Sequence, residues 1–331
     1  MQTIDYNAIE KNTLYFKQQL GKSKLCAVLK NNAYGHGLMH VARHIAELVD
    51  CFAVGSVDEA EQLLLLKKDV LVLLPQNSRN TERAIKGNCI VTVDSFSTLD
   101  TVDKVAKNLK TTARVHIKID SGMSRLGFHY SEIDKLLQLF RGANIEVEGI
   151  FSHFYGDTER ECDKQLKQFR DCYKLIEQSY GKSLVKHIAN SGATLLSPKY
   201  HLDMARVGLG LFGYGNDNLV PAKSVYADVI AVKDVPAGSV VGYGAKYVCS
   251  KDTKIAVLNV GYALGLARTL IGSKIKIGTK LYPIVAICMA MALVDVGDAP
   301  INVGDTATLL DKDVNIANDK VIIYELLCNL K

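Results

Sequence analysis

Residues 24–49, KLCAVLKNNAYGHGLMHVARHIAELV, contain a complete strand, turn and helix, and this unit is the first of a series that decides the fold. The apolar run at residues 24–31 has the composition of a buried β-strand. A glycine-rich turn then leads into an amphipathic segment of helical length at residues 38–49. The strand carries one lysine, Lys30, near its carboxyl end. Taken alone, Lys30 fits either a strand-end lysine that reaches solvent or a lysine placed to form a Schiff base with a carbonyl cofactor.

The same alternation of Val/Ile/Leu-rich runs with amphipathic stretches continues along the chain, and it is typical of repeated βα units and a parallel sheet. We expect eight strands, at residues 24–31, 51–55, 69–74, 89–94, 113–120, 146–152, 185–190 and 202–207. Eight strands with intervening helices in about two hundred residues match the size of a closed (β/α)₈ barrel of the TIM type. The sequence therefore predicts such a barrel over residues 1–217, with its chemistry at the carboxyl ends of the strands.

After residue 215 the helical periodicity largely disappears. Strand-like runs follow at residues 225–235, 254–260, 281–287, 292–296 and 306–310, separated by turn residues. This pattern predicts a second, mainly β domain over residues 218–331 that follows the barrel without a flexible linker.

The composition is that of a globular protein, which we expect to work in the cytoplasm. Of the 331 residues, 48% are hydrophobic, and the formal charge of +5 comes from interspersed basic and acidic residues rather than a basic stripe. We therefore expect no nucleic-acid partner. The sequence has neither a leader-like start nor an apolar run of about 20 residues, so we expect no membrane span. The eight cysteines form no Cys-x-x-Cys pair, which indicates reduced core thiols.

One pair of histidines has the spacing of metal ligands. His40 and His44 lie one helical turn apart, but no third ligand is apparent nearby. We interpret the pair as part of a helix surface and expect no metal.

Polar residues gather where the predicted strands end. They are Lys30, Tyr34, Lys118, Asp120, Arg125, Ser152, His153, His187, Asn190, Ser191 and Arg206. The loops after the last two strands of such a barrel commonly bind phosphate, so Ser191, Gly208 and Leu209 are the candidate phosphate site. A Schiff-base lysine and a phosphate site in one barrel mouth indicate pyridoxal 5′-phosphate, which carries both a carbonyl and a phosphate.

The chain resembles the alanine racemase family, whose members are pyridoxal-phosphate enzymes of fold type III. The resemblance rests on residues 27–37, 116–127, 151–154, 189–191, 204–206, 243–247, 261–263 and 285–289, in this order. It implies a homodimer with active sites shared between the subunits and an interconversion of L-alanine and D-alanine. The family's usual product is D-alanine for peptidoglycan precursors.

The resemblance also implies a two-base mechanism. Lys30 would serve one face of the substrate, and Tyr243, from the β domain of the partner subunit, the other. Tyr243 can act near neutral pH only if its pKa falls from about 10, which His153, with Arg206 behind it, would bring about. Arg206 would donate a hydrogen bond to the pyridine nitrogen of the cofactor and leave that nitrogen unprotonated. We expect this to limit side reactions such as transamination.

The remaining roles come from the same resemblance. Arg125 would contact the phenolic oxygen of the cofactor and the substrate carboxylate. Lys118 is either the carbamate that the family often carries, which would orient Arg125, or an unmodified lysine that pairs with Asp120 or faces the barrel interior. The other residues expected at the site are Tyr34 and Ser191 at the phosphate, His187 beside the cofactor ring, Asn190, Gly208 and Leu209 at the cofactor, and Tyr262 and Met289 at the substrate.

Three departures from the family pattern bear on substrate and cofactor. Leu264 and Ala290 stand where the family usually has aspartate, and the sequence ends at Lys331 without the usual tail and its phosphate-binding tyrosine. We expect the first two to broaden or shift substrate selection, for example towards serine. The third should weaken cofactor binding by about 1–3 kcal/mol.

Two other classes share the barrel and the cofactor. A non-catalytic pyridoxal-phosphate carrier would lack the second domain and Tyr243. A barrel-type amino-acid decarboxylase would pair the same two domains in a longer chain and release carbon dioxide from a basic amino acid.

Overall fold

The computed structural model describes residues 1–140 and 142–330. The chain forms two compact units. One comprises Ile9–Ala33 and Gly37–Leu219, and the other comprises Met1–Ala8, Tyr34–His36 and Val220–Lys331. The division after residue 219 lies close to the boundary expected after residue 217. The sequence did not predict that residues 1–8 and 34–36 group with the later part of the chain.

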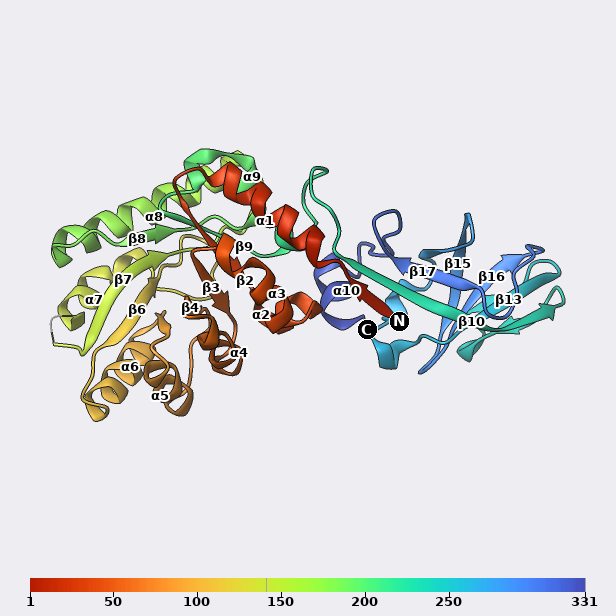
Figure 1. Cartoon of the computed structure of the whole chain (residues 1–331), viewed down its shortest axis with the longest axis horizontal. Coiled ribbons are helices and arrows are strands. Elements are labelled where there is room, and N and C mark those ends of the chain that lie inside the picture. Colours follow the sequence, from red (N-terminus) through yellow and green to blue (C-terminus); the bar gives the residue numbers. More distant parts are fainter. Residues whose placement is uncertain (141, 331) are drawn as a thin grey trace. The chain divides into compact units, whose positions relative to one another are not determined.

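The first unit is a nearly closed barrel of eight parallel strands (Figure 1). They are β2 (Lys24–Val28), β3 (Cys51–Val54), β4 (Asp69–Val72), β5 (Ile90–Val93), β6 (Ala113–Lys118), β7 (Ile145–Phe151), β8 (Val185–His187) and β9 (Met204–Val207). The order in the sheet is β8-β7-β6-β5-β4-β3-β2-β9. Backbone hydrogen bonds from Asp203 N to Lys186 O (3.1 Å) and from Arg206 N to Ala189 O (3.0 Å) join β8 to β9. The eight-stranded barrel predicted from the sequence is thus confirmed, although most of the strands are shorter than expected.

Helices surround these strands, and Figure 1 shows α4 to α8 on the outside of the barrel. The helices are α1 (Tyr6–Leu20), α2 (Lys30–Gly35), α3 (Leu38–Ile45), α4 (Val57–Leu63), α5 (Ser78–Lys86), α6 (Phe96–Asn108), α7 (Ile133–Phe140), α8 (Glu159–Tyr180) and α9 (Ser191–Leu196). Ser56, Ser95 and Thr158 cap α4, α6 and α8 by accepting a hydrogen bond from a backbone N–H of the first turn. These caps fix where each helix starts relative to the preceding strand end.

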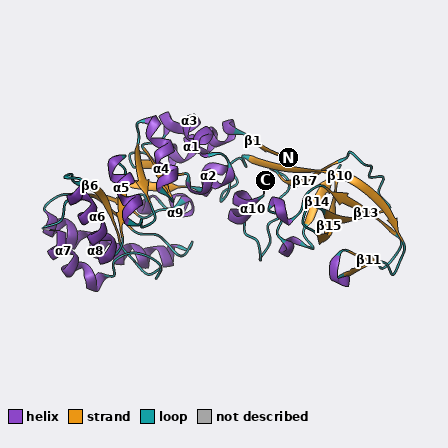
Figure 2. Ribbon diagram, turned by 90° about the horizontal axis from the view of Figure 1, so that it is seen from below, coloured by secondary structure: helices purple, strands orange, loops and turns teal. Residues whose placement is uncertain are grey.

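The second unit is built on a seven-stranded sheet with antiparallel pairing. Its strands are β1 (Gln2–Ile4), β10 (Lys223–Val235), β13 (Thr253–Leu258), β14 (Lys274–Ile277), β15 (Lys280–Ile287), β16 (Ala292–Gly297) and β17 (Thr306–Leu310). A separate two-stranded hairpin joins β11 (Val240–Val241) to β12 (Tyr247–Val248). Figure 2 shows the strands of this unit and labels its helix α10 (Ile323–Asn329).

The five strands predicted for this unit are present within one or two residues of their expected bounds. The sequence did not predict β1, β14, the hairpin or α10. No helix in the described part of the chain is both long and apolar enough to cross a membrane.

Candidate active site

Lys30 lies at the mouth of the barrel, two residues after β2 ends at Val28, and it begins α2. That helix is left-handed, because the φ angles of Asn31, Asn32, Ala33 and Tyr34 all lie at 53–54°. An L-residue in this conformation costs about 1–2 kcal/mol. Four in succession therefore need support from outside the turn. The strand expected to run to residue 31 is shortened by this turn.

The end of the turn belongs to the second unit. Tyr34 is 6% exposed. Its ring centroid lies 6.1 Å from that of Tyr324 in α10. Burial raises the pKa of the Tyr34 hydroxyl above its ordinary value, so the hydroxyl stays protonated and can donate a hydrogen bond. Gly35 has φ 77°, and a Cβ there would lie 2.3 Å from Leu327 O, so this position requires glycine.

Arg206 of β9 extends into the barrel and contacts only neutral groups. Its Nη1 donates to His187 Nδ1 (2.7 Å), and its Nη2 lies 2.7 Å from Ser152 O and 3.2 Å from His153 Nδ1. None of the groups that its guanidinium contacts in the described chain is acidic, and its Nε–H makes no hydrogen bond there. Burial lowers the pKa of Arg206 to about 10, which still leaves it charged at neutral pH.

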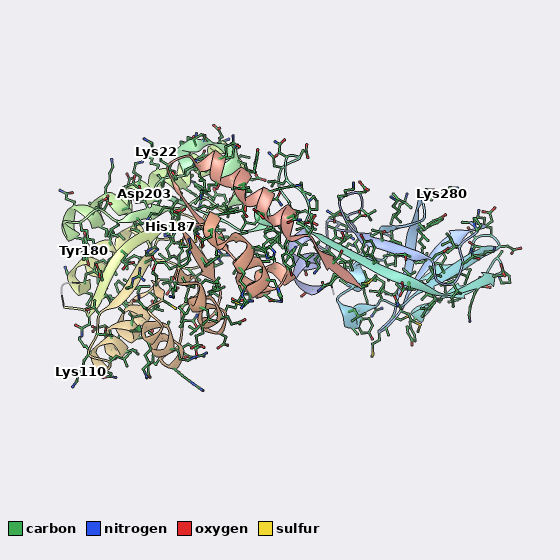
Figure 3. All side chains as sticks on the ribbon, viewed as in Figure 1. Lys22, Lys110, Tyr180, His187, Asp203 and Lys280 are labelled. Atoms are coloured by element: carbon green, nitrogen blue, oxygen red, sulfur yellow. The ribbon has the colours of Figure 1, made fainter. Side chains whose placement is uncertain are left out.

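His187 stands behind Arg206 rather than at an open surface. It has no exposed area and stacks on Phe151, with the ring centroids 4.9 Å apart. Its Nε2 lies 2.9 Å from Nδ1 of His116 on β6. Figure 3 labels His187, which lies among the barrel strands. Because Arg206 donates to His187 Nδ1, His187 Nε2 carries the proton and donates to His116. Both ring nitrogens of His187 and one ring face therefore have protein partners, and its expected place beside the cofactor ring stays a prediction.

A small pocket at the barrel mouth brings together Lys118, Arg125 and His153. The ammonium of Lys118 is buried and lies 4.5 Å from the centre of the Phe151 ring. Burial first, and then the charges of Arg206 and Arg125, lower the pKa of Lys118 to about 7. A neutral amine, the form that can react with carbon dioxide, is therefore well populated near neutral pH.

The loops after β8 and β9 meet at Ser191. Its Oγ accepts hydrogen bonds from Gly208 N and Gly210 N, both at 3.1 Å. The N–H of Gly208 therefore has an acceptor within the loop, and the expected place of Gly208 at the phosphate stays a prediction. Leu209 is the first residue of a 3₁₀ turn, so its N–H has no acceptor within that turn. Asn190 caps α9 through its side chain, which accepts from Ala193 N (2.9 Å).

The barrel mouth is electropositive. Burial, followed by the charges of Arg206, Lys118, Arg125 and Lys30, holds the pKa of His153 well below its ordinary value. Basic side chains thus outweigh acidic ones in the electrostatic surroundings of His153. The Nε–H of Arg206, the N–H of Leu209 and the amine of Lys30 match the ring nitrogen, phosphate and aldehyde of pyridoxal 5′-phosphate, so the donor set fits that cofactor.

Three of the motifs on which the resemblance rests lie together in the second unit, at residues 243–247, 261–263 and 285–289. Tyr262 N donates to Cys288 O (3.0 Å), and Ala263 N donates to Met289 O (2.9 Å). A Cβ at Gly242, the residue before Tyr243, would lie 2.5 Å from the Cβ of Ala286. The exposed side chains that these contacts gather are Tyr243, Tyr262, Leu264, Met289 and Met291.

Two family models match the chain. The model described as the alanine racemase N-terminal domain covers residues 4–216, and the one described as the alanine racemase C-terminal domain covers residues 222–331. The chain belongs to the alanine racemase family. The resemblance inferred from the sequence motifs is thus confirmed, and the second match argues against a carrier built from the barrel alone.

Matches to individual alanine racemases extend over nearly the full chain. Alanine racemase 1 of Oceanobacillus iheyensis is 33% identical, with 98% of this chain and 94% of that protein matched. The alanine racemase of Methanococcus maripaludis is 34% identical, with 97% and 91% matched.

Solved alanine racemase structures share the fold. The enzyme of a D-cycloserine-producing Streptomyces lavendulae superimposes with a TM-score of 0.91 at 29% identity, over 100% of this chain and 94% of that one. The Bartonella henselae enzyme gives a TM-score of 0.90 at 25% identity, over 100% and 96%, and contains covalently bound pyridoxal phosphate. The predicted cofactor is therefore that of the family.

Sequence reasoning missed two residues that shape the barrel mouth. His116 begins the motif at residues 116–127, but the sequence does not predict its hydrogen bond to His187, which joins residues 71 positions apart. Phe151 contacts His187, Lys118 and Arg206 through its ring faces. A buried aromatic residue just before Ser152-His153 was the available signal, but sequence spacing does not show which rings stack.

Proposed function

We propose that this chain is a pyridoxal-phosphate-dependent racemase that interconverts L-alanine and D-alanine. The observation that carries the proposal is the buried Arg206, a cation whose protein partners are all neutral and whose Nε–H makes no hydrogen bond in the described chain. A guanidinium placed in this way donates a hydrogen bond without giving up its proton. The bound cofactor would supply an electron sink that makes the Cα–H bond of the substrate acidic.

Two residues of the chain would move the proton. Lys30 would hold the cofactor covalently and, once released, serve as a base on one face of the substrate Cα, with Tyr243 of the partner subunit on the opposite face. Arg206 donates to His153 Nδ1, so His153 Nε2 carries a hydrogen that can be donated to the oxygen of Tyr243. Such a donor stabilises the phenolate and favours proton removal by Tyr243.

The other site residues would bind and orient. Tyr34, Ser191 and Leu209 would donate hydrogen bonds to the phosphate, while Gly208 and Asn190 would shape the loops that hold them. His187 would orient Arg206 rather than touch the cofactor. The positively charged mouth supports this assignment, because both the phosphate and the substrate carboxylate are anionic.

Arg125, Tyr262 and Met289 would contact the substrate. Arg125 suits the carboxylate because a guanidinium can bind both of its oxygens. Lys118, if carbamylated, would place a negative charge beside Arg125 and hold it in position.

We further propose a homodimer that works in the cytoplasm and supplies D-alanine for peptidoglycan precursors. Tyr243, Tyr262, Leu264, Met289 and Met291 expose large hydrophobic side chains on or beside segments that contact one another. This exposure supports an interface between copies, since exposed apolar groups on neighbouring segments often mark such surfaces. No disulfide joins the eight cysteines, all of which lie in the described part of the chain, as expected in a reducing compartment.

A racemisation assay in deuterated water tests the proposal. Wild type should convert each alanine enantiomer and introduce deuterium at Cα. Lys30→Ala should lose the absorbance of the lysine-bound cofactor and all turnover, whereas Tyr243→Phe should keep the absorbance and lose turnover by about a hundredfold or more. Wild-type rates in Tyr243→Phe would contradict its role as a base.

Serine or a broader set of substrates is the second candidate. Leu264 is 40% exposed in the second unit and brings an apolar side chain to a position where the family usually has a carboxylate. The same assay across the common amino acids separates the two cases. A kcat/KM for serine that equals or exceeds that for alanine would favour the second.

A further inference from the structure

The left-handed turn that follows Lys30 is held by a carboxylate from another helix. We propose that Glu59 is a positioning residue for Lys30: by binding the backbone of the turn, it fixes the direction in which the lysine leaves the strand end. The inference rests on the proposed function insofar as it concerns Lys30 as the cofactor lysine.

The two carboxylate oxygens of Glu59 bind two different loops. Oε1 accepts a hydrogen bond from Asn32 N (3.0 Å), inside the left-handed turn. Oε2 accepts from Gly55 N (3.0 Å) and Ser56 N (3.3 Å), in the loop after β3. One side chain of α4 thus joins the carboxyl ends of β2 and β3. Hydrogen bonds to an ionised carboxylate are stronger than those between neutral groups, which suits the support of a strained backbone.

Asn32 is fixed on its other side by α3. Its backbone O accepts from Gly37 N (3.0 Å), and its side-chain Oδ1 accepts from Leu38 N (2.8 Å). With Glu59 on its N–H, Asn32 has partners on its N–H, its backbone oxygen and its side chain. Asparagine tolerates the left-handed conformation better than most residues, but Ala33, which follows it, has no such tolerance. The fixed Asn32 therefore keeps the turn from relaxing to the ordinary right-handed form.

The loop bound by Oε2 lies directly against the lysine. A Cβ placed on Gly55 would be 3.5 Å from the Cβ of Lys30 and 3.6 Å from Oε2 of Glu59. The backbone of Gly55 therefore packs closely against the Cβ of Lys30. Loss of Glu59 would make both the loop at Gly55 and the left-handed turn more mobile. The side chain of Lys30 would then adopt more orientations before the cofactor binds.

Glu59 also has a local role that the test must separate. It forms a capping box with Ser56, whose Oγ accepts from Glu59 N (3.3 Å), at the start of α4. Ser56→Ala breaks this cap and leaves the carboxylate contacts to Asn32 and Gly55 in place. Glu61→Ala removes a carboxylate from the same helix, where it pairs with Arg83 at the surface, and controls for the change in charge.

The experiment compares Glu59→Ala, Glu59→Gln, Ser56→Ala and Glu61→Ala in the full chain. Amide hydrogen exchange before addition of cofactor reports the turn, and absorbance titration with pyridoxal 5′-phosphate gives its dissociation constant. We expect Glu59→Ala to speed exchange at residues 30–33 and to weaken cofactor binding by about tenfold or more. Glu59→Gln, which keeps one acceptor oxygen, should fall between it and wild type. The two control variants should leave both quantities at wild-type values even where they lower Tm.

Exchange and cofactor binding in Glu59→Ala that match the Ser56→Ala control would overturn the inference and leave Glu59 as a helix cap only. If Glu59→Ala does not fold, the same comparison is made with Glu59→Gln. Failure of the proposed function gives a different result: wild type itself would then form no lysine-bound cofactor, while the exchange measurement would still report on Glu59 and the turn.

Discussion

Arg206, His187 and His116 form a hydrogen-bonded row through the barrel interior in which only the arginine is charged. A histidine with Nδ1 facing an arginine must remain neutral, because protonation would set two cations against each other. The cost of keeping two imidazoles unprotonated is small at neutral pH but grows as the solution becomes acidic. The row therefore ties the stability of the barrel to pH.

Acid should destabilise the protein through these histidines. Burial, followed by the charges of Arg114 and Arg206, lowers the pKa of His116 from 6.5 to about 3, and burial also lowers the pKa of His187. Between pH 6.5 and about pH 3, the unfolded chain therefore binds more protons at these histidines than the folded one. Above pH 6.5 these histidines should thus leave the free energy of unfolding unchanged. As the pH drops towards 3, the free energy of unfolding should fall by about 1.4 kcal/mol per pH unit for each additional proton that the unfolded chain binds.

Urea unfolding at several pH values checks this expectation. Below pH 6.5, His116→Asn should reduce the slope of the free energy of unfolding against pH. The reduction should correspond to at most one proton fewer taken up on unfolding. Leu99→Ala, a core variant without a titratable group, should lower stability by the same amount at every pH. An unchanged slope in His116→Asn would contradict the assignment.

Lys118 carries a second prediction at the scale of one residue. With its pKa near 7, the neutral amine predominates at pH 8 and should take up carbon dioxide. Carbon-13 NMR of the protein in labelled bicarbonate should show a carbamate resonance that Lys118→Met lacks. A spectrum without that resonance would indicate the unmodified lysine, and a resonance that survives in Lys118→Met would place the modification elsewhere.

The hairpin that carries Tyr243 has a short ladder. Only two residue pairs join β11 to β12, Val240 with Val248 and Val241 with Tyr247. The hairpin contacts the main sheet through Val241, which is buried in a cluster with Ile255 and Val285. The hydroxyl of Tyr247 adds a hydrogen bond, which it donates to Asp295 of β16. Asp295 also accepts from Thr253 Oγ1 (2.5 Å) and Gly297 N (3.0 Å). Burial acts to raise the pKa of Asp295, but these hydrogen bonds outweigh it and keep the carboxylate ionised.

Removal of that hydroxyl should loosen the hairpin. We expect Tyr247→Phe to lower the local opening free energy by about 1–2 kcal/mol, because a hydrogen bond to a charged acceptor is lost. Hydrogen exchange at residues 240–248 should become faster. Tyr226→Phe on β10, whose hydroxyl makes no hydrogen bond in the described residues, is the matched control. Equal exchange rates in the two variants would show that side-chain packing alone holds the hairpin.

Much of the fold could be predicted because its elements repeat. The barrel strands carry Val, Ile and Leu in runs that periodicity detects, and their order follows from the βα pattern. β2 was predicted three residues too long, because nothing in Lys30-Asn31-Asn32 shows a left-handed turn whose support comes from Glu59, nearly thirty residues away. The two-residue strands of the hairpin were missed because so short a run has no detectable period.

The candidate site, like the fold, could be predicted where it depends on the order of the strands and not where it depends on packing. Lys30, Arg206 and His153 could be placed at one mouth because parallel strands end on the same side. The use of the Gly208 amide by Ser191, and the burial of His187 behind Arg206, depend on how loops and rings pack in three dimensions. Sequence motifs do not contain that information.

For the whole molecule, the proposed active site needs two copies of the chain. Lys30 would come from one subunit and Tyr243 from the other, so variants in different subunits should complement each other. Co-expression of differently tagged Lys30→Ala and Tyr243→Phe should restore about one quarter of wild-type activity: half of randomly formed dimers are mixed, and each mixed dimer has one intact site.

Each variant expressed alone sets the background of that experiment. Restored activity should copurify with both tags. Dimers that carry both tags without activity would mean that each subunit builds its site from its own Lys30 and Tyr243.

The pairing of β1 with β10, in which Gln2 lies opposite Val225, sets an order of events during synthesis. The amino-terminal strand leaves the ribosome long before its neighbour exists, and so remains unpaired while the whole barrel is made. Late docking of the first residues then becomes the step that completes the seven-stranded sheet. Genetic separation of the chain at residue 219 would divide that pair between two polypeptides, and each fragment would expose a sheet edge until they reassociated.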